Sequence, residues 1–572
     1  MSHRAGAVVA AALVSAVAAV ACGSDSVAPS PPVDAGGDAP GAETACPAPG
    51  YRGALDSACV VGGWAACFEG TKPREGGWGC EAIVAPTACV GATRETMGQL
   101  GCVPVGDCNA PFPPPGATHF VSPSATPDAT HFTNVAEAVA AAPAGAVVAV
   151  DQGAYTGSVR ITKDLTVVGR CPEKVSLNAQ LDEPAFRILA KASVRGFTLQ
   201  KTVIGISIAP GGELRLEDTV LDGNSLAGIS LSDGNGKLDA ARIVVRGTRP
   251  SSGGDRGMGL NVQASSTAVI RDASFAGNSG QNVRVSSSST ATLERVILRD
   301  GRPSPAFDFG RGLQLQGGAK ATLTRAAVID DYEIGIAAGD GTTLDLKDVV
   351  VARTKLAKSG SFGRALNAFG GAIVNVDGLH AYDNHDASIM VAEKGTRVAI
   401  RRSVIADTQL DRDGYVGRAL TTQEGASLEV EDSAVVGSRE SALAVFGQGS
   451  RAVIRRAVIT QTSPNASDVF GHGALVTLGG ALLVEDVEIS RSAGFGIGVG
   501  DGSARIVRAR IRGNAVGLYA QDGTTVREVT DPSLEPDLRE VLVTTDTVFE
   551  DNVSRVGAGR VPLPEPARVL GP

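Results

Sequence analysis

The chain has 572 residues, which is enough for one very large core or for several domains. Its 72 glycines, its 4% aromatic content and its many Val, Ile, Leu and Ala residues favour short strands and tight turns over helical bundles. The net charge of −9 argues against nucleic acid as a partner, because phosphate binding needs a basic surface.

Residues 1–21 have the form of an export signal. Arg4 precedes an apolar run that is too short for a comfortable membrane span, and small residues then lead to Cys22. The segment Ala19-Val20-Ala21-Cys22 resembles a relaxed bacterial lipobox, which implies cleavage before Cys22 and lipidation of its thiol. The alternative is ordinary signal cleavage, with Cys22 left to pair elsewhere.

The segment that follows Cys22 is predicted to be a tether. Residues 22–45 consist mostly of Ser, Pro, Ala, Gly and Asp and cannot bury a core. Gly23 stands where an aspartate would signal inner-membrane retention, so the lipobox resemblance implies a cell-envelope protein anchored to the outer membrane. We therefore expect contact with the membrane only through the N-terminal lipid.

Residues 46–110 form a cysteine-rich segment. Apart from Cys22 the chain has eight cysteines, an even number that indicates disulfides in an exported protein. The repeat is visible in CFEGTKPREGGWGC and CVGATRETMGQLGC. A small module held by bridges rather than by a core is expected. The eight cysteines are Cys46, Cys59, Cys67, Cys80, Cys89, Cys102, Cys108 and Cys171.

The connectivity of these cysteines stays open, because eight of them allow about 105 pairings. Three successive pairs are each separated by 13 positions, and we favour pairing within them. We further favour a bond between Cys108 and Cys171, which would attach the module to the rest of the chain. A zinc site is the competing interpretation, but the module has no CxxC pair and no histidine.

Residues 111–556 are predicted to form the body of the protein. Near its start, apolar strands surround a short amphipathic helix over Asn134 to Ala142. This arrangement resembles the opening of pectin-lyase-like β-helix domains, in which such a helix caps the first coil. A cap is needed because an open strand edge would pair with other chains.

An internal repeat supports a solenoid. A short segment of the pattern small–Ile/Leu–x–Val/Ala recurs from GISI to GLYA, with spacings that mostly alternate between 23 and 30–32 residues. The second residue of each repeat lies at Ile206, Ile229, Leu260, Val283, Leu313, Ile336, Leu366, Ile389, Leu420, Leu443, Leu475, Ile497 and Leu518.

The shorter spacing suits one coil of three strands and three turns. A second apolar strand follows in each coil, as in ATLERVIL, and several coils turn at Asn224, Asn278, Asn384 or Asn514. These residues resemble the asparagine ladder of pectate-lyase-like solenoids. We therefore predict an all-β fold, a single-stranded right-handed parallel β-helix of about 15 coils. Leucine-rich repeats and β-propellers lack support, because their repeat motifs are absent.

The longer coils carry an insertion just before the repeated strand. The insertions share an aromatic residue, a glycine and a basic residue, as in SFGRAL and YVGRAL. Stacked on alternate coils, they could hold an acidic polysaccharide, with aromatics on the sugar rings and arginines on the carboxylates. This hypothetical ligand face consists of Phe309, Arg311, Phe362, Arg364, Tyr415, Arg418, Phe470 and His472.

A structural role for the same residues is the alternative. The aromatics would then fold back onto the solenoid, and each arginine would pair with an Asp or Glu of the adjacent coil. Repetition of one gene segment would also make the insertions look alike without any ligand.

Known catalytic motifs are incomplete. Asp330-Asp331 and Gly471-His472-Gly473 match two parts of a polygalacturonase-like site, but they lie about six coils apart and the other parts are missing. A site of two Asp and one Arg, as in pectin methylesterases, needs no linear motif and stays open. The segment His380 to Asp386 groups two histidines with two carboxylates, but it also contains the predicted turn at Asn384. We assign no catalytic residue, metal or cofactor.

Three functions remain. The first is a non-catalytic surface lipoprotein that binds glycan or other envelope material as a monomer. The second is a polysaccharide lyase, hydrolase or esterase, and the third is a passive spacer. Exposed, ordered aromatics in the insertions would favour the first, a carboxylate cluster on facing coils beside a cleft would favour the second, and buried aromatics with paired arginines would favour the third. Residues 557–572 are expected to form a C-terminal tail.

Overall fold

The computed structural model describes residues 50–52, 59–62, 66–179, 182–251, 254, 257–306 and 309–569. Residues 1–45 form one unit and residues 46–572 the other. The export signal, Cys22, the tether and Cys46 lie outside the described residues. Within the described ranges, no helix is long and apolar enough to cross a membrane.

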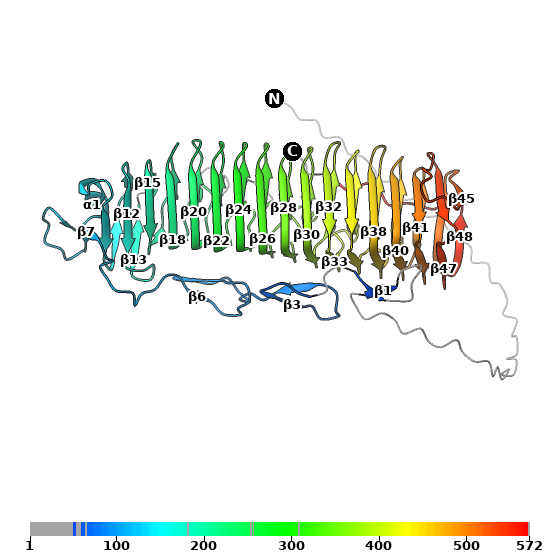
Figure 1. The fold of residues 1–572 in the computed structure, drawn as a ribbon, viewed down its shortest axis with the longest axis horizontal. Helices are drawn as coiled ribbons and strands as arrows, with labels where there is room; N and C mark the ends of the chain where they lie inside the picture. The colour runs from blue at the N-terminus through cyan, green and yellow to red at the C-terminus, as the bar shows by residue number, and fades with distance from the viewer. Residues whose placement is uncertain are drawn as a thin grey trace, which may run out of the picture. The chain divides into compact units, whose positions relative to one another are not determined.

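Parallel strands build the unit of residues 46–572. Two sheets of 26 and 16 strands run its length, and neighbouring strands within each sheet come mainly from successive coils (Figure 1). The larger sheet covers two faces, here called the first and second, and the smaller sheet forms the third face. The predicted β-helix is confirmed, and its 16 third-face strands agree with the expected number of coils.

The strands have regular lengths. Among the described strands, nine of ten residues each span the first and second faces: β18 (Glu213–Asp222), β20 (Lys237–Arg246), β22 (Thr267–Ala276), β24 (Thr290–Arg299), β26 (Lys320–Ile329), β28 (Thr343–Ala352), β30 (Ile373–Tyr382), β38 (Arg451–Thr460) and β40 (Ala481–Ser490). Other coils use shorter strands there: β9 (Val147–Val150), β10 (Gly153–Thr156), β12 (Leu165–Gly169), β13 (Val175–Asn178), β15 (Lys191–Arg195), β16 (Thr198–Gln200), β32 (Arg397–Arg401), β33 (Val404–Ala406), β35 (Ser427–Glu431), β36 (Ala434–Val436), β42 (Ser503–Val507), β43 (Arg510–Arg512), β45 (Thr525–Val529), β46 (Glu540–Thr544) and β47 (Val548–Glu550).

The third face carries the repeated segment found in the sequence. Its strands are β11 (Val159–Ile161), β14 (Phe186–Ile188), β17 (Ile204–Ile208), β19 (Ala227–Leu231), β21 (Met258–Val262), β23 (Gln281–Ser286), β25 (Arg311–Gln316), β27 (Ile334–Ala338), β29 (Arg364–Ala368), β31 (Asp386–Ala392), β34 (Gly417–Gln423), β37 (Ser441–Phe446), β39 (His472–Thr477), β41 (Phe495–Gly500), β44 (Val516–Gln521) and β48 (Ser554–Ala558).

Side-chain alternation places the core inside the coils. On the third face, Ile206, Ile229, Leu260 and Val283 stack in register and are fully buried. Each such aliphatic side chain contributes about 1.5–3 kcal/mol of burial free energy, so the stack is a large part of the driving force. The intervening residues of each strand point outward and form the outer surface of the coils.

One repeat position needs correction. The register pairs Leu443 with Ala474, and Ala474 with Ile497, so Ala474 rather than Leu475 occupies the inward column. The sequence pattern favours the larger aliphatic residue, but Leu475 points outward and contacts Leu563. With Ala474 in the column, the spacing keeps its alternation of 31 and 23 residues.

The first coil is capped as expected. Helix α1 (Val135–Ala141) begins after Asn134, whose side chain accepts hydrogen bonds from the amides of Ala136 and Glu137. Its buried residues, including Val135 and Val139, belong to the main core. The neighbouring strands β7 (Ala117–Val121) and β8 (His131–Phe132) pair with each other, and β7 also pairs with β9.

The predicted asparagine ladder is present at the turn before the third face. Asn278 accepts from the Thr248 amide and donates to the Val245 carbonyl, and Asn384 does the same with Thr354 and Val351. Each side chain therefore bonds the backbone of the preceding coil. Such buried bonds hold successive turns in register.

Asp331 occupies a ladder position where other coils have Asn. Its Oδ1 accepts from the Gly301 amide and from Asn282 Nδ2. Its Oδ2 is buried without a hydrogen-bond partner among the described residues. Burial raises the pKa of Asp331 well above its usual range, against the opposing bond from Gly301.

Asp331→Asn is therefore expected to stabilise the protein near neutral pH. Because the pKa of Asp331 is raised in the folded state, the stability that this carboxyl group contributes is complete below its unfolded pKa of about 3.9. That contribution is lost as the pH rises. We expect Asp331→Asn to raise the free energy of unfolding by about 1–2 kcal/mol at pH 8 and to change it little at pH 3.5. Urea denaturation at both pH values measures this, with the exposed turn variant Asp340→Asn as control. An equal effect at both pH values would contradict the assignment.

The cysteine-rich module forms an extended strap along the second face. We call residues 66–110 the strap. It contains the disulfides Cys67–Cys80 and Cys89–Cys102, and a third bond joins Cys108 to Cys171. These are three of the four pairs that the sequence favours. Cys59 is also disulfide-bonded, and its expected partner Cys46 lies outside the described residues.

Short hairpins give the cysteine-rich module its local structure. They pair β1 (Gly50–Arg52) with β2 (Cys59–Val61), β3 (Thr71–Pro73) with β4 (Cys80–Ala82), and β5 (Thr93–Arg94) with β6 (Val103–Pro104). Figure 1 shows them in blue beneath the coils, in the order β6, β3, β1 from the capped end. The strap therefore runs against the direction in which the coils advance.

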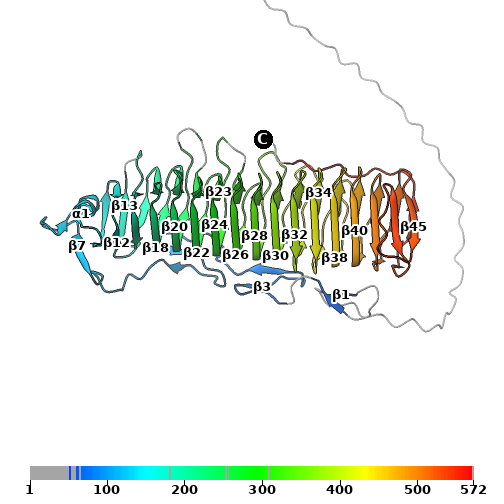
Figure 2. The ribbon, with the colours of Figure 1, turned by 45° about the horizontal axis from the view of Figure 1, so that its top comes forward.

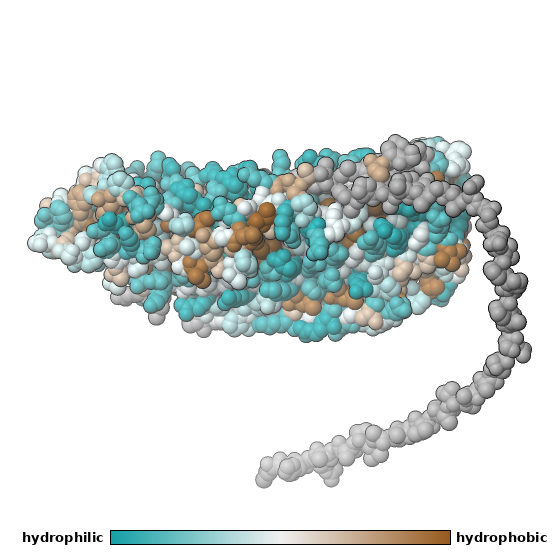
Figure 3. All heavy atoms as spheres, turned by 90° about the horizontal axis from the view of Figure 1, so that it is seen from below, coloured by the Kyte–Doolittle hydropathy of each residue, from teal (hydrophilic) through white to brown (hydrophobic). Residues whose placement is uncertain are grey.

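The strap covers outward apolar residues of the second face. Phe68 belongs to one hydrophobic cluster with outward side chains from several coils, including Val350, Val404 and Val436. The face seen in Figure 3 is largely hydrophilic, with small separate hydrophobic patches. Covering this apolar stripe reduces the risk that one solenoid associates with another.

Polar contacts fix the register of the strap. The guanidinium of Arg246 donates to the carbonyls of Cys89 and Gly91, and the Cys80 amide donates to Nδ1 of His380. Burial, with a smaller effect of Arg74, lowers the pKa of His380 to about 4. The imidazole is therefore neutral at pH 7 and accepts the bond from the strap.

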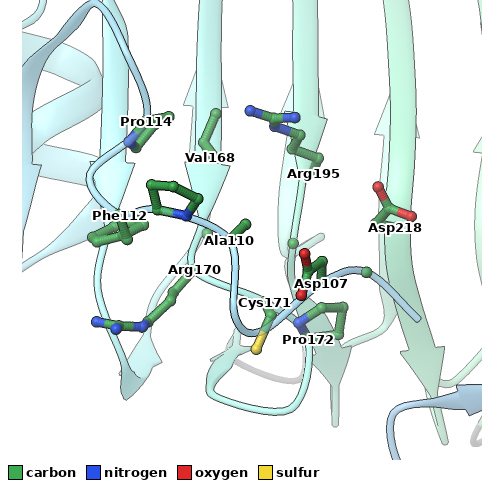
Figure 4. A pocket seen from close by; sticks show the side chains of 14 residues that line it. Asp107, Ala110, Phe112, Pro114, Val168, Arg170, Cys171, Pro172, Arg195 and Asp218 are labelled. Carbon is green, nitrogen blue, oxygen red and sulfur yellow. The ribbon is translucent and has the colours of Figure 1, made fainter. Parts of the chain in front are cut away.

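The bond between Cys108 and Cys171 attaches the strap to the first coils. Figure 4 shows the small pocket beside it, with Phe112 and Arg170 on one side and Arg195 and Asp218 on the other. The pocket has a volume of about 150 Å³. Arg170 is held by an ion pair with Asp151 and lies over the Phe112 ring, so these side chains serve the junction.

Candidate functional site

The insertions of the longer coils stack on one another, as predicted. The Arg412 amide donates to the Gly360 carbonyl, and the Ala466 amide donates to the Gly414 carbonyl. Lys358 Nζ donates to the carbonyl of Ser304 in the preceding insertion. The insertions therefore form a wall along one edge of the third face.

The three arginines of the predicted ligand face are buried and paired with carboxylates of the next coil. Arg311 makes two hydrogen bonds to Glu333, and Arg364 and Arg418 donate to Asp386 and Glu440. The expectation that these arginines form a free anion-binding column is wrong. An isolated buried guanidinium would be too costly, so each one takes a carboxylate partner from its own protein.

Two of the aromatic residues support the arginines instead of facing solvent. The Arg311 guanidinium lies 4.7 Å from the ring centre of Phe309, and Arg364 lies 4.7 Å from that of Phe362. Tyr415 differs, because Arg418 stacks on Phe446 and leaves the tyrosine 48% exposed. Tyr415 is thus the exposed aromatic side chain of the predicted face.

His472 is also buried. It accepts a hydrogen bond from the Phe495 amide through Nδ1, and its ring stacks on the Phe495 ring at 4.3 Å. Burial lowers the pKa of His472 to about 4, so the ring is neutral at pH 7. This histidine therefore replaces arginine at a structural position and does not act as a free basic group.

The C-terminal segment returns over the third face. Residues 559–569, here called the tail, leave β48 and run back along the coils (Figure 2). Leu563 contacts Phe446 and Leu475, and Ala567 contacts Met390. The tail therefore covers an outward apolar stripe on these coils.

A cleft lies between the insertion wall and the tail. It has a volume of about 510 Å³, which is in the range of small-molecule sites. The wall contributes Ser359, Ser361, Asp411, Asp413, Tyr415, Val416 and Phe470, the coils contribute Asp386, Arg418 and Glu440, and the tail contributes residues 563–568. We call this space the tail cleft.

Acidic groups outnumber basic groups in the tail cleft. Five carboxylates line it against two guanidinium groups. Burial raises the pKa of Asp411, and the nearby charges of Asp386 and Asp413 act in the same direction against a hydrogen bond from the Tyr415 amide. The cleft therefore favours a neutral or positively charged ligand over an acidic one.

Several buried polar atoms of the cleft lack a partner. Nε and Nη1 of Arg418 and Oε2 of Glu440 have no hydrogen-bond partner in the part of the chain that the structure describes. Arg418 is 1% exposed. Buried polar atoms are normally hydrogen-bonded, and a polar molecule could reach the Arg418 guanidinium only where the tail, whose Glu565 carbonyl binds it, gives way.

The sequence identifies only part of this site. Tyr415, Arg418 and Phe470 belong to the predicted face and line the cleft, whereas Phe309, Arg311, Phe362, Arg364 and His472 do not. The carboxylates Asp386, Asp411, Asp413 and Glu440 were missed. Asp411 and Asp413 stand four and two positions before Tyr415 in the same insertion, which is a signal that could have been used.

The other candidates from the sequence serve the fold. Asp331 belongs to the ladder, and His380 binds the strap. His385 Nδ1 lies 3.0 Å from the Thr354 carbonyl. Within the described ranges, no three or more His, Cys, Asp or Glu residues are arranged to hold a metal ion.

Comparison with known proteins agrees with the fold. A family model described as a right-handed β-helix region matches residues 189–351. A comparison with curated proteins finds no significant match. The molecule is a right-handed parallel β-helix protein with a disulfide-bonded N-terminal segment.

Similar solved structures include proteins of different kinds. An alginate lyase from Paenibacillus sp. str. FPU-7 is 12% identical, with coverage of 52% of this chain and 90% of that chain and a TM-score of 0.27. The A-module of the Azotobacter vinelandii mannuronan C-5 epimerase AlgE4 is 12% identical, with coverage of 76% and 94% and a TM-score of 0.26. The N-terminal fragment of the bacteriophage Phi29 gene product 12 is 9% identical, with coverage of 76% and 94% and a TM-score of 0.31. Likenesses this distant carry no argument about function.

Proposed function

We propose that this protein is a cell-envelope lipoprotein that binds a saccharide in the tail cleft. The observation that carries the proposal is the exposed aromatic ring of Tyr415 in a cleft of about 510 Å³ that is also lined by carboxylates and by Arg418. Aromatic rings stack on the apolar faces of sugars, while carboxylates and guanidinium groups bind hydroxyls. The envelope location rests on the lipobox resemblance at Cys22.

The ligand that suits the cleft is a neutral or amine-bearing saccharide. The acidic polysaccharide expected from the sequence depended on free arginines, and these are paired with Glu or Asp. An acidic sugar would approach several carboxylates, including Asp411 and Asp413, and like charges would weaken its binding. An amino group would meet complementary charge.

Tyr415→Ala is the variant that tests the cleft. Loss of ring stacking, worth about 1–1.5 kcal/mol, should weaken the binding of a chitosan oligosaccharide about five- to twelvefold. Isothermal titration measures the affinity. Val469→Ala is the matched control, because Val469 is 44% exposed on a wall insertion but does not line the cleft. Equal affinity of the wild-type and Tyr415→Ala proteins would place the site elsewhere.

Glycoside cleavage is the second candidate function, and one observation favours it. Asp411 has a raised pKa and lies in a cleft with other carboxylates, as a general acid of a glycosidase would. Incubation with oligosaccharides, followed by measurement of reducing ends, tests this function. Release that is lost in Asp411→Asn supports cleavage, whereas retention without release supports binding alone.

A further inference from the structure

The tail is held mainly through its backbone. The guanidinium of Arg418 donates to the Glu565 carbonyl at 2.6 Å, and that of Arg364 donates to the Arg568 carbonyl at 2.6 Å. Gln423 Nε2 donates to the Ala567 carbonyl at 2.9 Å. The Glu565 and Arg568 side chains are themselves exposed. Three side chains of the third face thus bind a row of carbonyl oxygens.

A row of carbonyl oxygens offers a series of hydrogen-bond acceptors, as the hydroxyls of a saccharide chain do. Pro562, Pro564 and Pro566 have no amide hydrogen, so this part of the tail is rich in acceptors and poor in donors. Sugar hydroxyls also accept hydrogen bonds from guanidinium and amide groups. The contacts that hold the tail are therefore contacts that a saccharide can use.

The tail lines the cleft and uses only part of the hydrogen-bonding capacity of Arg418. Arg418 gives Nη2 to the tail and to Glu440, but its Nε and Nη1 are buried without partners in the described chain. The apolar anchors are few, chiefly Leu563 on Phe446 and Leu475, and Ala567 on Met390. These contacts suit a segment that can leave.

We infer that the tail is a removable cover that competes with saccharide for the tail cleft. The inference rests on the proposed function and adds regulation of the same site. A ligand that reaches Arg418 and Gln423 displaces the carbonyls of Glu565 and Ala567. Because the tail is part of the chain, it competes at a high effective concentration and weakens apparent affinity without any conformational change in the coils.

A full-length variant with a loosened tail tests the inference. Leu563→Asn with Ala567→Gln places uncharged polar groups in the two apolar contacts and should release the tail while the coils stay intact, without adding negative charge that would itself attract an amine-bearing saccharide. We expect chitosan oligosaccharide to bind this variant about tenfold tighter or more than it binds wild-type protein. Arg560→Ala is the control, because the Arg560 side chain is 90% exposed and its ion pair with Asp522, at 3.8 Å, is too exposed to hold the tail. Circular dichroism checks that the coils remain folded.

A labelled peptide with the sequence of residues 560–569 gives a readout that needs no saccharide. The peptide should bind the loosened variant and be displaced from it by chitosan oligosaccharide. Its affinity for wild-type protein should be lower by about tenfold or more. Equal saccharide affinity in the wild-type and loosened proteins would overturn the cover and leave the proposed function standing. Peptide binding without saccharide binding in either protein would overturn the proposed function, and with it the competition.

Discussion

Arg311→Met is expected to lower the free energy of unfolding by about 3–5 kcal/mol, because it leaves a buried carboxylate without its partner. Nε and Nη2 of Arg311 lie 2.6 and 3.0 Å from the two carboxylate oxygens of Glu333. The two side chains are only 8% and 9% exposed. Water therefore cannot replace the lost guanidinium.

Urea denaturation of three variants measures this effect. Arg456→Met is the matched control. The Arg456 side chain is 47% exposed, so loss of its ion pairs with Asp432 and Glu431 should cost less than about 1 kcal/mol. Adding Glu333→Gln to Arg311→Met should recover much of the stability, since the buried charge is then removed. A loss from Arg311→Met no larger than that of the control would show that this ion pair is not structurally important.

The disulfide between Cys108 and Cys171 is expected to stabilise the protein more than the disulfides within the strap. It closes a loop of 63 residues, whereas the bond between Cys89 and Cys102 closes one of 13. The entropy of the unfolded chain then predicts losses of about 4 and 3 kcal/mol when each pair is replaced by Ala. The larger loss should accompany detachment of the strap from the first coils.

Denaturation of the two double-Ala variants under non-reducing conditions gives both values. Hydrogen exchange should show faster exchange near Val105, which packs on Val220 and Val244, only when the Cys108 bond is absent. If the loss were larger for the pair Cys89 and Cys102, the attachment to Cys171 would not be the main stabilising bond of the strap.

Local repetition made most of the fold predictable. The inward column, the cap at Asn134 and the ladder residues Asn278 and Asn384 each follow from patterns within one or two coils. The slip at Leu475 shows the limit of this reasoning. Alternation indicates that one of two neighbouring residues faces inward, but Ala474 and Leu475 both suit a buried position. The register places Ala474 inward, and the outward Leu475 is covered by the tail, which no local pattern records.

The candidate site depends on contacts that no local pattern records. The partners of Arg311 and Arg418 come from the next coil, 22 residues away, and were named only as a general alternative. The tail contact between Arg418 and Glu565 spans 147 residues. Because such contacts decide which arginines are free, the sequence overestimated the basic character of the predicted face.

The preference of the tail cleft for saccharide charge is the most direct test of the account. The measurement is binding of a chitosan oligosaccharide, a neutral β-glucan oligosaccharide and an alginate oligosaccharide to the full-length protein and to the variant with the loosened tail. The account predicts binding of the amine-bearing or neutral saccharide, tighter in the loosened variant and weakened by Tyr415→Ala, with the acidic saccharide bound least. Tightest binding of alginate, or no binding of any saccharide by either protein, would contradict it.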